Sequence, residues 1–125
     1  MATFKSFEEI EAWKKARILT REVYSITNTR EFARDFGLKD QIRRAAVSVP
    51  SNISEGFDRD SKNQFVYFLV IAKGSCGELR TQLKIARILN YLNEEKYITI
   101  NDKCISVSKQ LAGFITYLKS HKNKI

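Results

Sequence analysis

Residues 65–86 read FVYFLVIAKGSCGELRTQLKIA, and the spacing of the apolar residues in this segment is the strongest indication of the fold class. Apolar or small residues recur along it at alternating spacings of four and three: Phe65, Leu69, Ala72, Cys76, Leu79, Leu83 and Ala86. Such a repeat places all seven side chains on one side of an α-helix, as in the seam of a helical bundle. Ser61 and Gln64 before it have the spacing of an N-terminal capping box. The sequence therefore predicts one long helix over about residues 61–92.

Three further segments show the same helical periodicity. The first opens at Ser6 with a second S-x-x-E capping box, and the last follows Asn93, an amide that can cap a helix. The middle one contains Pro50, which we expect to kink the helix without ending it, because its apolar stripe continues to Ile53. The predicted helices are about 7–27, 38–56, 61–92 and 94–119, with a connection over 28–37 and a basic tail over 120–125.

The overall composition favours one all-α domain spanning residues 1–125. Hydrophobic residues make up 43% of the 125 positions, enough for a core, while five Gly and one Pro are too few for the many turns of an all-β fold. Four amphipathic helices with mostly short connections predict an antiparallel up-down-up-down four-helix bundle. Neither a signal peptide nor an apolar run of membrane-spanning length is visible, so we expect a cytoplasmic protein without a membrane partner.

The sequence offers little for catalysis or metal binding. Two cysteines and one histidine cannot form a four-ligand zinc site, both cysteines fall on seam positions, and His121 lies in the predicted tail. We therefore expect no enzyme activity, no metal and no cofactor. One alternative is a hydrolase or nuclease around Glu55, in a polar row that could equally be a solvated face or an intersubunit network. That row is Gln41, Arg44, Ser48, Ser51, Asn52 and Glu55.

The charge is more informative than any motif. The chain carries 22 basic and 14 acidic residues, a formal charge of +8, and residues 61–125 hold 11 of the basic but only 4 of the acidic ones. Four of these basic residues share a sector of about 60° on the third predicted helix, with Glu78 as the one nearby acid. The stripe is either a solvated edge or a phosphate-binding surface. The candidate nucleic-acid-binding residues are Lys73, Arg80, Lys84 and Arg87, helped by Arg43, Arg44, Lys14, Arg17 and Arg21.

The same helix has a second apolar face. Gly74 and Gly77 lie in its middle, where small side chains would let another helix approach closely. A helix that is apolar on two sides is central to its own bundle or buried against another subunit. The predicted oligomer interface consists of Val66, Val70, Gly74, Gly77, Ile85 and Ile88.

Several strings resemble one known family. The string QIRRAAVSVPSNISEG at residues 41–56, with WKKA at 13–16 and ELRTQL at 78–83, resembles the bacterial four-helix-bundle proteins encoded in intervening sequences of 23S rRNA genes. That family is in turn similar to the accessory variability proteins of diversity-generating retroelements. The resemblance spans about residues 5–120. Ser54, Cys76 and Gly77 depart from the usual pattern, and Gly77 would alter how closely subunits pack.

The resemblance implies a homopentameric barrel with a basic surface that binds nucleic acid, and no established enzyme activity. It supplies no catalytic residue, and the reverse transcriptase partner of the retroelement relatives is not extended to this chain. Our primary hypothesis is thus a non-enzymatic oligomer that contacts phosphates, with RNA favoured over DNA. The alternative is an oligomeric scaffold whose second apolar face binds a protein partner.

Overall fold

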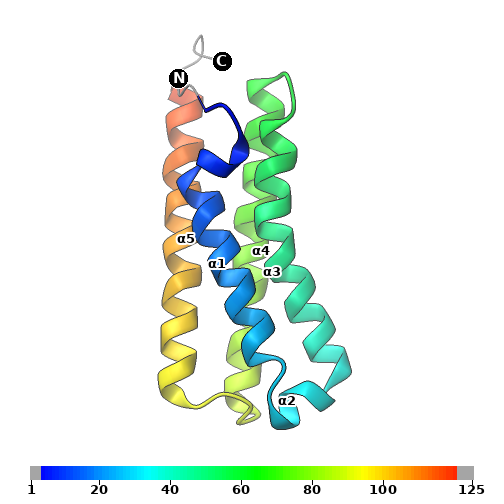
Figure 1. Ribbon diagram of the computed structural model, residues 1–125. Helices are drawn as coiled ribbons and strands as arrows, with labels where there is room; N and C mark the ends of the chain where they lie inside the picture. Colours follow the sequence, from blue (N-terminus) through cyan, green and yellow to red (C-terminus); the bar gives the residue numbers. More distant parts are fainter. Residues whose placement is uncertain (1–3, 121–125) are drawn as a thin grey trace.

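The computed structural model describes residues 4–120, and this part of the chain is all α. Four long helices alternate in direction and form an antiparallel bundle, which confirms the predicted fold class (Figure 1). Helix α1 packs on α3 and α5, and α4 packs on the same two neighbours, so α1 and α4 lie on opposite corners. The elements are η1 (Phe7–Glu9), α1 (Glu11–Ile26), α2 (Arg30–Arg34), α3 (Phe36–Phe57), α4 (Lys62–Ile88) and α5 (Glu94–Ser120).

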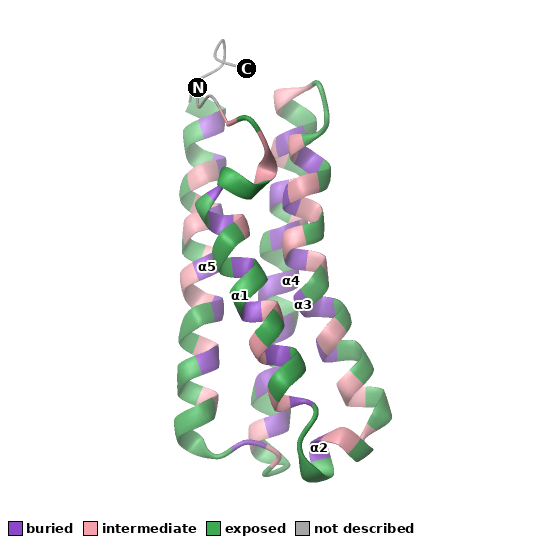
Figure 2. Cartoon of the chain, in the orientation of Figure 1, coloured by how far each residue is buried: buried purple, intermediate pink, exposed green. Residues whose placement is uncertain are grey.

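The core lies on the predicted seams. All seven seam residues of α4 are buried, and they meet buried residues of α1, α3 and α5 in one continuous cluster along the bundle axis (Figure 2). Cys76 and Cys104 are both 0% exposed, as expected for thiols at seam positions. No helix within residues 4–120 is long and apolar enough to cross a membrane.

The first helix begins later than predicted, because the capping box at Ser6 does not form. Ser6 makes no cap hydrogen bond; instead a short 3₁₀ turn follows it, and the Glu9 carboxylate accepts from the Lys5 amide at 3.1 Å. Ile10, only 2% exposed, takes an extended conformation before α1 starts at Glu11. Burial of Ile10 against the bundle therefore sets the start of α1.

The predicted connection over 28–37 contains the short helix α2 and the first residues of α3. Phe32 of α2 is 1% exposed and its ring lies 5.1 Å from that of Tyr91. Asp35 then caps α3 by accepting from the Leu38 amide at 3.1 Å. Helix α3 thus starts at Phe36 rather than near Leu38, and it continues through Pro50 as predicted.

The close approach of α3 to α4 depends on Gly56. A Cβ atom at this position would lie 2.8 Å from Cβ of Phe68 and 3.2 Å from the carbonyl oxygen of Phe65. Both contacts are shorter than ordinary van der Waals distances. Gly56 therefore lets the two backbones meet, and α3 ends at Phe57, one residue after its predicted end.

Helix α4 ends four residues earlier than predicted. Asn90 adopts a left-handed conformation with φ of 63°, and the Tyr91 amide donates to the carbonyl of Ala86 at 2.9 Å. The Asn90 amide also donates to the carbonyl of Arg87 at 3.0 Å, which completes a Schellman motif. The other predicted caps are present: Ser61 accepts from Gln64 and Asn93 from Lys96. Helix α5 runs to Ser120, and the rest of the predicted tail lies outside the described residues.

Candidate nucleic-acid interface

The basic stripe of α4 lies along the edge where α4 meets α5. The ammonium of Lys84 is 5.0 Å from the ring centroid of Tyr97 in α5. Lys73 and Arg80 are exposed, and neither forms an ion pair with any residue between 4 and 120. Three of the four predicted basic residues, Lys73, Arg80 and Lys84, thus form no ion pair within the described chain, and Lys84 also covers a tyrosine ring.

Arg87, the fourth member of the stripe, is already paired. Its Nε donates to Glu94 Oε1 at 2.9 Å, and its Nη1 donates to Asn90 Oδ1 at 3.3 Å. The sequence-based expectation that Glu78 is the one nearby acid was therefore wrong, because the turn after α4 brings Glu94 back to the end of the stripe. Arg87 offers less free positive charge than the other three residues.

Two further lysines, which were not predicted as part of the stripe, extend this edge. Lys62 lies 11 residues before Lys73, close to three helical turns, so it projects from the same side of α4. Lys119 of α5 lines the same surface hollow as Lys62. The angular period could have identified Lys62, whereas Lys119 needed the antiparallel register of α4 and α5. We call Lys62, Lys73, Arg80, Lys84 and Lys119 the α4–α5 basic edge.

The basic residues predicted on α1 lie on another face of the molecule. Lys14 is 3.8 Å from Glu11, and the Arg17 guanidinium is 5.9 Å from the ring centroid of Trp13. Arg21 is exposed and forms no ion pair within the described chain. Because α1 lies on the corner opposite α4, these residues do not join the α4–α5 basic edge.

The two predicted arginines of α3 are engaged within the protein. Arg43 Nε donates to Thr27 Oγ1 at 2.8 Å, and its guanidinium stacks 4.3 Å from the ring centroid of Tyr24. This contact secures the C-terminal end of α1 against α3. Arg44 pairs with Asp40 at 2.9 Å on the surface of the same helix. The nine predicted basic residues therefore form three groups rather than one surface.

The second apolar face of α4 is uncovered. Val70 is 50% exposed, Ile85 is 41% exposed and Ile88 is 69% exposed. A Cβ atom added at Gly74 or Gly77 would have no neighbouring atom of another element within 4 Å. Nothing in the described chain therefore requires glycine at these two positions, and a row of exposed apolar side chains is typical of an interaction surface.

Part of the polar row of α3 reaches α4 through Ser48, while Gln41, Arg44, Ser51 and Glu55 are exposed. Ser48 and Ser75 share a hydrogen bond of 2.8 Å, and the Asn52 amide donates to both the carbonyl and the hydroxyl of Ser48. Glu55 pairs with Arg59 on the surface. No serine in this network contacts a basic side chain that could activate it, so the network holds the two helices together.

The two cysteines interact across α4 and α5. The Cys104 thiol donates to the carbonyl oxygen of Cys76 at 3.3 Å. Its hydrogen bond with the Cys76 side chain, together with burial, raises the pKa of Cys104, and the same hydrogen bond lowers the pKa of Cys76. Both thiols are enclosed by the core, which favours a packing role over nucleophilic chemistry.

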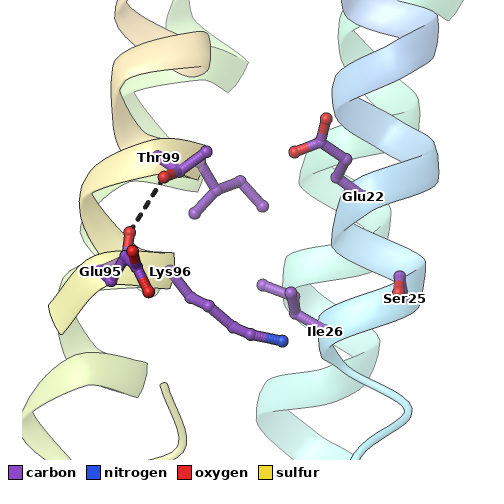
Figure 3. Close-up of a pocket in the computed structure, with 7 residues that line it drawn as sticks. Glu22, Ser25, Ile26, Glu95, Lys96 and Thr99 are labelled. Carbon is purple, nitrogen blue, oxygen red and sulfur yellow. Dashed lines mark hydrogen bonds between the residues drawn. The ribbon is translucent and has the colours of Figure 1, made fainter. Parts of the chain in front are cut away.

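A hollow of about 330 Å³ lies between α1 and α5. Figure 3 shows Glu22 and Ile26 of α1 on one side, and Lys96 of α5 extending toward them from the other. Glu22 is already paired with Lys103. Between residues 4 and 120 no three metal-ligating side chains come together, here or elsewhere. The hollow contains no arrangement of groups typical of catalysis.

Comparisons with known proteins give one family and one fold. The profile described as 23S rRNA-intervening sequence protein matches residues 8–113. A crystal structure of a protein of unknown function from the S23 ribosomal protein family of Bacteroides thetaiotaomicron superposes with a TM-score of 0.79 at 23% identity, covering 84% of this chain and 95% of that one. At this identity the likeness establishes the fold alone. A comparison with curated proteins gave no significant match.

Proposed function

The chain belongs to the 23S rRNA-intervening sequence protein family, and we propose that it is a non-enzymatic oligomer that binds RNA through phosphate contacts along the α4–α5 basic edge. The observation that carries the proposal is the exposure of Lys73 and Arg80, without ion pairs to residues 4–120, on the same side of α4 as Lys62 and Lys84. The row from Lys62 to Lys84 extends over about 33 Å of helix.

The favourable free energy of RNA binding would come from contacts to the phosphates of the RNA. Each phosphate that a lysine or arginine neutralises releases condensed counterions, so the affinity depends steeply on salt and little on sequence. A row of basic residues on a straight helix fits the regular backbone of a nucleic acid duplex better than its base edges. We therefore expect contacts to phosphates, with RNA favoured over DNA because of the family.

The uncovered apolar face of α4 supports self-assembly. We propose that a second copy of the chain covers Val70, Ile85 and Ile88, with the other copy approaching closely at Gly74 and Gly77. Val66 is partly buried against the chain's own core and lies at the margin of this face. The family resemblance gives a homopentamer as the expected size. Assembly would repeat the basic edge in every subunit, which increases the affinity for a long polyanion.

The binding experiment compares two variants with equal charge changes. K73Q/R80Q/K84Q removes three charges from the α4–α5 basic edge, and K14Q/R17Q/R21Q removes three from α1. We expect the first variant to lower the slope of log affinity against log salt by about 2 to 3 for a structured RNA, and the second to leave the slope close to that of the unchanged protein. Equal effects of the two variants, or no salt dependence at all, would contradict the proposal.

The assembly is tested separately by sedimentation. Gly77→Leu places a large side chain where the single chain has open space, so the helical bundle itself should remain folded. We expect this variant to sediment as a smaller species than the unchanged protein, with the same helical content by circular dichroism. If the unchanged protein is a monomer, self-assembly is refuted, and the apolar face then supports the second candidate function, a scaffold that binds a different protein.

We also propose a cytoplasmic location. The free thiols of Cys76 and Cys104 support it, since paired cysteines are usual in oxidising compartments.

A further inference from the structure

A second surface hollow lies at the end of the bundle where α4 begins and α5 ends. Its volume is about 710 Å³, within the range of about 300–1,000 Å³ that is usual for small-ligand sites. Four of the six residues that line it belong to the start of α4, one is the N-cap of α4 and one belongs to the end of α5. They are Ser61, Lys62, Asn63, Val66, Tyr67 and Lys119.

Tyr67 supplies an accessible aromatic ring in this hollow. Tyr67 is 61% exposed, although a tyrosine side chain has a large ring that proteins usually bury. Its ring lies 5.3 Å from that of Phe68 at an interplanar angle of 83°, an edge contact that leaves the face of the tyrosine ring open. An exposed aromatic face can stack on a planar ligand such as a nucleic acid base.

The charges around the ring select an anionic ligand. Lys62 and Lys119 come from different helices and line the same hollow, and no carboxylate lines it. Neither lysine forms an ion pair with a residue of the described chain. A ligand that combines a flat ring with a negative charge, as a nucleotide does, matches both features.

The hollow is continuous with the α4–α5 basic edge. Lys62 is a member of both, so an RNA that follows Lys84, Arg80 and Lys73 along α4 reaches the hollow at its end. We propose that this hollow binds an unpaired nucleotide of the RNA: the base stacks on Tyr67, Lys62 and Lys119 hold the adjoining phosphate, and the Asn63 amide bonds to the edge of the base. This inference rests on the proposed function and narrows its ligand to RNA with an unpaired base beside a duplex.

The test uses two RNA hairpins, one blunt and one with a short overhang that contains 2-aminopurine, a base whose fluorescence falls when it stacks. Stacking on an aromatic side chain contributes about 1–3 kcal/mol per base, so we expect the overhang hairpin to bind about tenfold more tightly and its fluorescence to fall on binding. Tyr67→Ala should abolish both effects, and Tyr67→Phe should keep them. Phe36→Ala is the matched control, because Phe36 is 75% exposed and belongs to α3.

The outcomes separate this inference from the proposed function. If K73Q/R80Q/K84Q weakens both hairpins while Tyr67→Ala changes neither the preference nor the fluorescence, the hollow does not bind a base, and phosphate binding stands. If neither hairpin binds the unchanged protein, both proposals fail. If Tyr67→Ala dissociates the oligomer in sedimentation, Tyr67 belongs to the subunit interface and the inference is overturned.

Discussion

Replacing Gly56 by alanine tests whether the contact between α3 and α4 sets the geometry of the bundle. The new methyl group would lie 2.8 Å from Cβ of Phe68 and 3.0 Å from Cδ1 of Phe65. The nearest of these atoms is a Cβ, which cannot move without its backbone, so the two helices must separate or shift. Overpacking of this kind costs about 1–3 kcal/mol.

A second effect of the substitution has the opposite sign. Alanine in place of glycine inside a helix contributes about 1 kcal/mol through backbone entropy. Gly113→Ala measures this term alone, because a Cβ atom at Gly113 in α5 has no neighbour within 4 Å. The overpacking cost less this gain leaves Gly56→Ala about 0–2 kcal/mol less stable than the unchanged protein, whereas we expect Gly113→Ala to be about 1 kcal/mol more stable.

The free energy of unfolding of both variants is measured by urea denaturation followed by circular dichroism, with the same m-value as a check on two-state unfolding. The sign of the difference between the two variants is the decisive quantity. If Gly56→Ala is as stable as Gly113→Ala, the close approach of α3 to α4 at Gly56 does not exist, and the packing of the bundle described above is wrong.

Three further predictions concern local structure. Asn90→Ala should cost about 1 kcal/mol in urea denaturation, because alanine tolerates the left-handed conformation poorly, while Asn90→Gly should cost nothing; equal losses would refute the Schellman ending of α4. The hydrogen bond from the Tyr91 hydroxyl to Asp35 raises the pKa of Tyr91 above its ordinary value of 10.0. The stability that this hydrogen bond contributes is therefore fully present below pH 10 and is lost as the pH rises through the raised pKa of Tyr91. Tyr91→Phe should therefore be less stable than the unchanged protein at pH 8, and its melting temperature should fall less steeply as the pH rises. Thermal melts of both proteins between pH 8 and 11 check this. Arg43→Leu should lower the free energy of unfolding by about 1.5–3 kcal/mol, because it removes the hydrogen bond of Arg43 to Thr27. Arg44→Leu breaks an exposed ion pair and should change the free energy of unfolding by less than about 1 kcal/mol. Similar losses in the two variants would contradict the different roles of the two arginines.

Most of the candidate site could be located from the sequence, but its electrostatics could not. The period of α4 placed Lys73, Arg80 and Lys84 on one side of a helix, because helical angles are fixed by residue number alone. The pairing of Arg87 with Glu94 depends on how the chain turns after Ile88, and the contribution of Lys119 depends on the register between α4 and α5. Both arrangements bring together residues of different helices, and helical periodicity does not predict which residues of two helices come close.

The number of long helices, the residues of their seams and the caps at Ser61 and Asn93 could all be predicted from the amino-acid sequence. These features follow from local periodicity and from hydrogen bonds within four residues. Three other features could not be predicted and became visible in the folded chain: Ser6 does not cap a helix, α2 exists, and α4 ends at Ile88. Helix α2 depends on the buried Phe32 ring, which packs against Tyr91 far away in the chain, and the Schellman motif that ends α4 places Tyr91 for this contact. At Ser6 the burial of Ile10 prevails over a local capping signal. Burial of this kind is worth more than one cap, about 1.5–3 kcal/mol against about 1 kcal/mol, which is why local signals fail where a large side chain reaches the core.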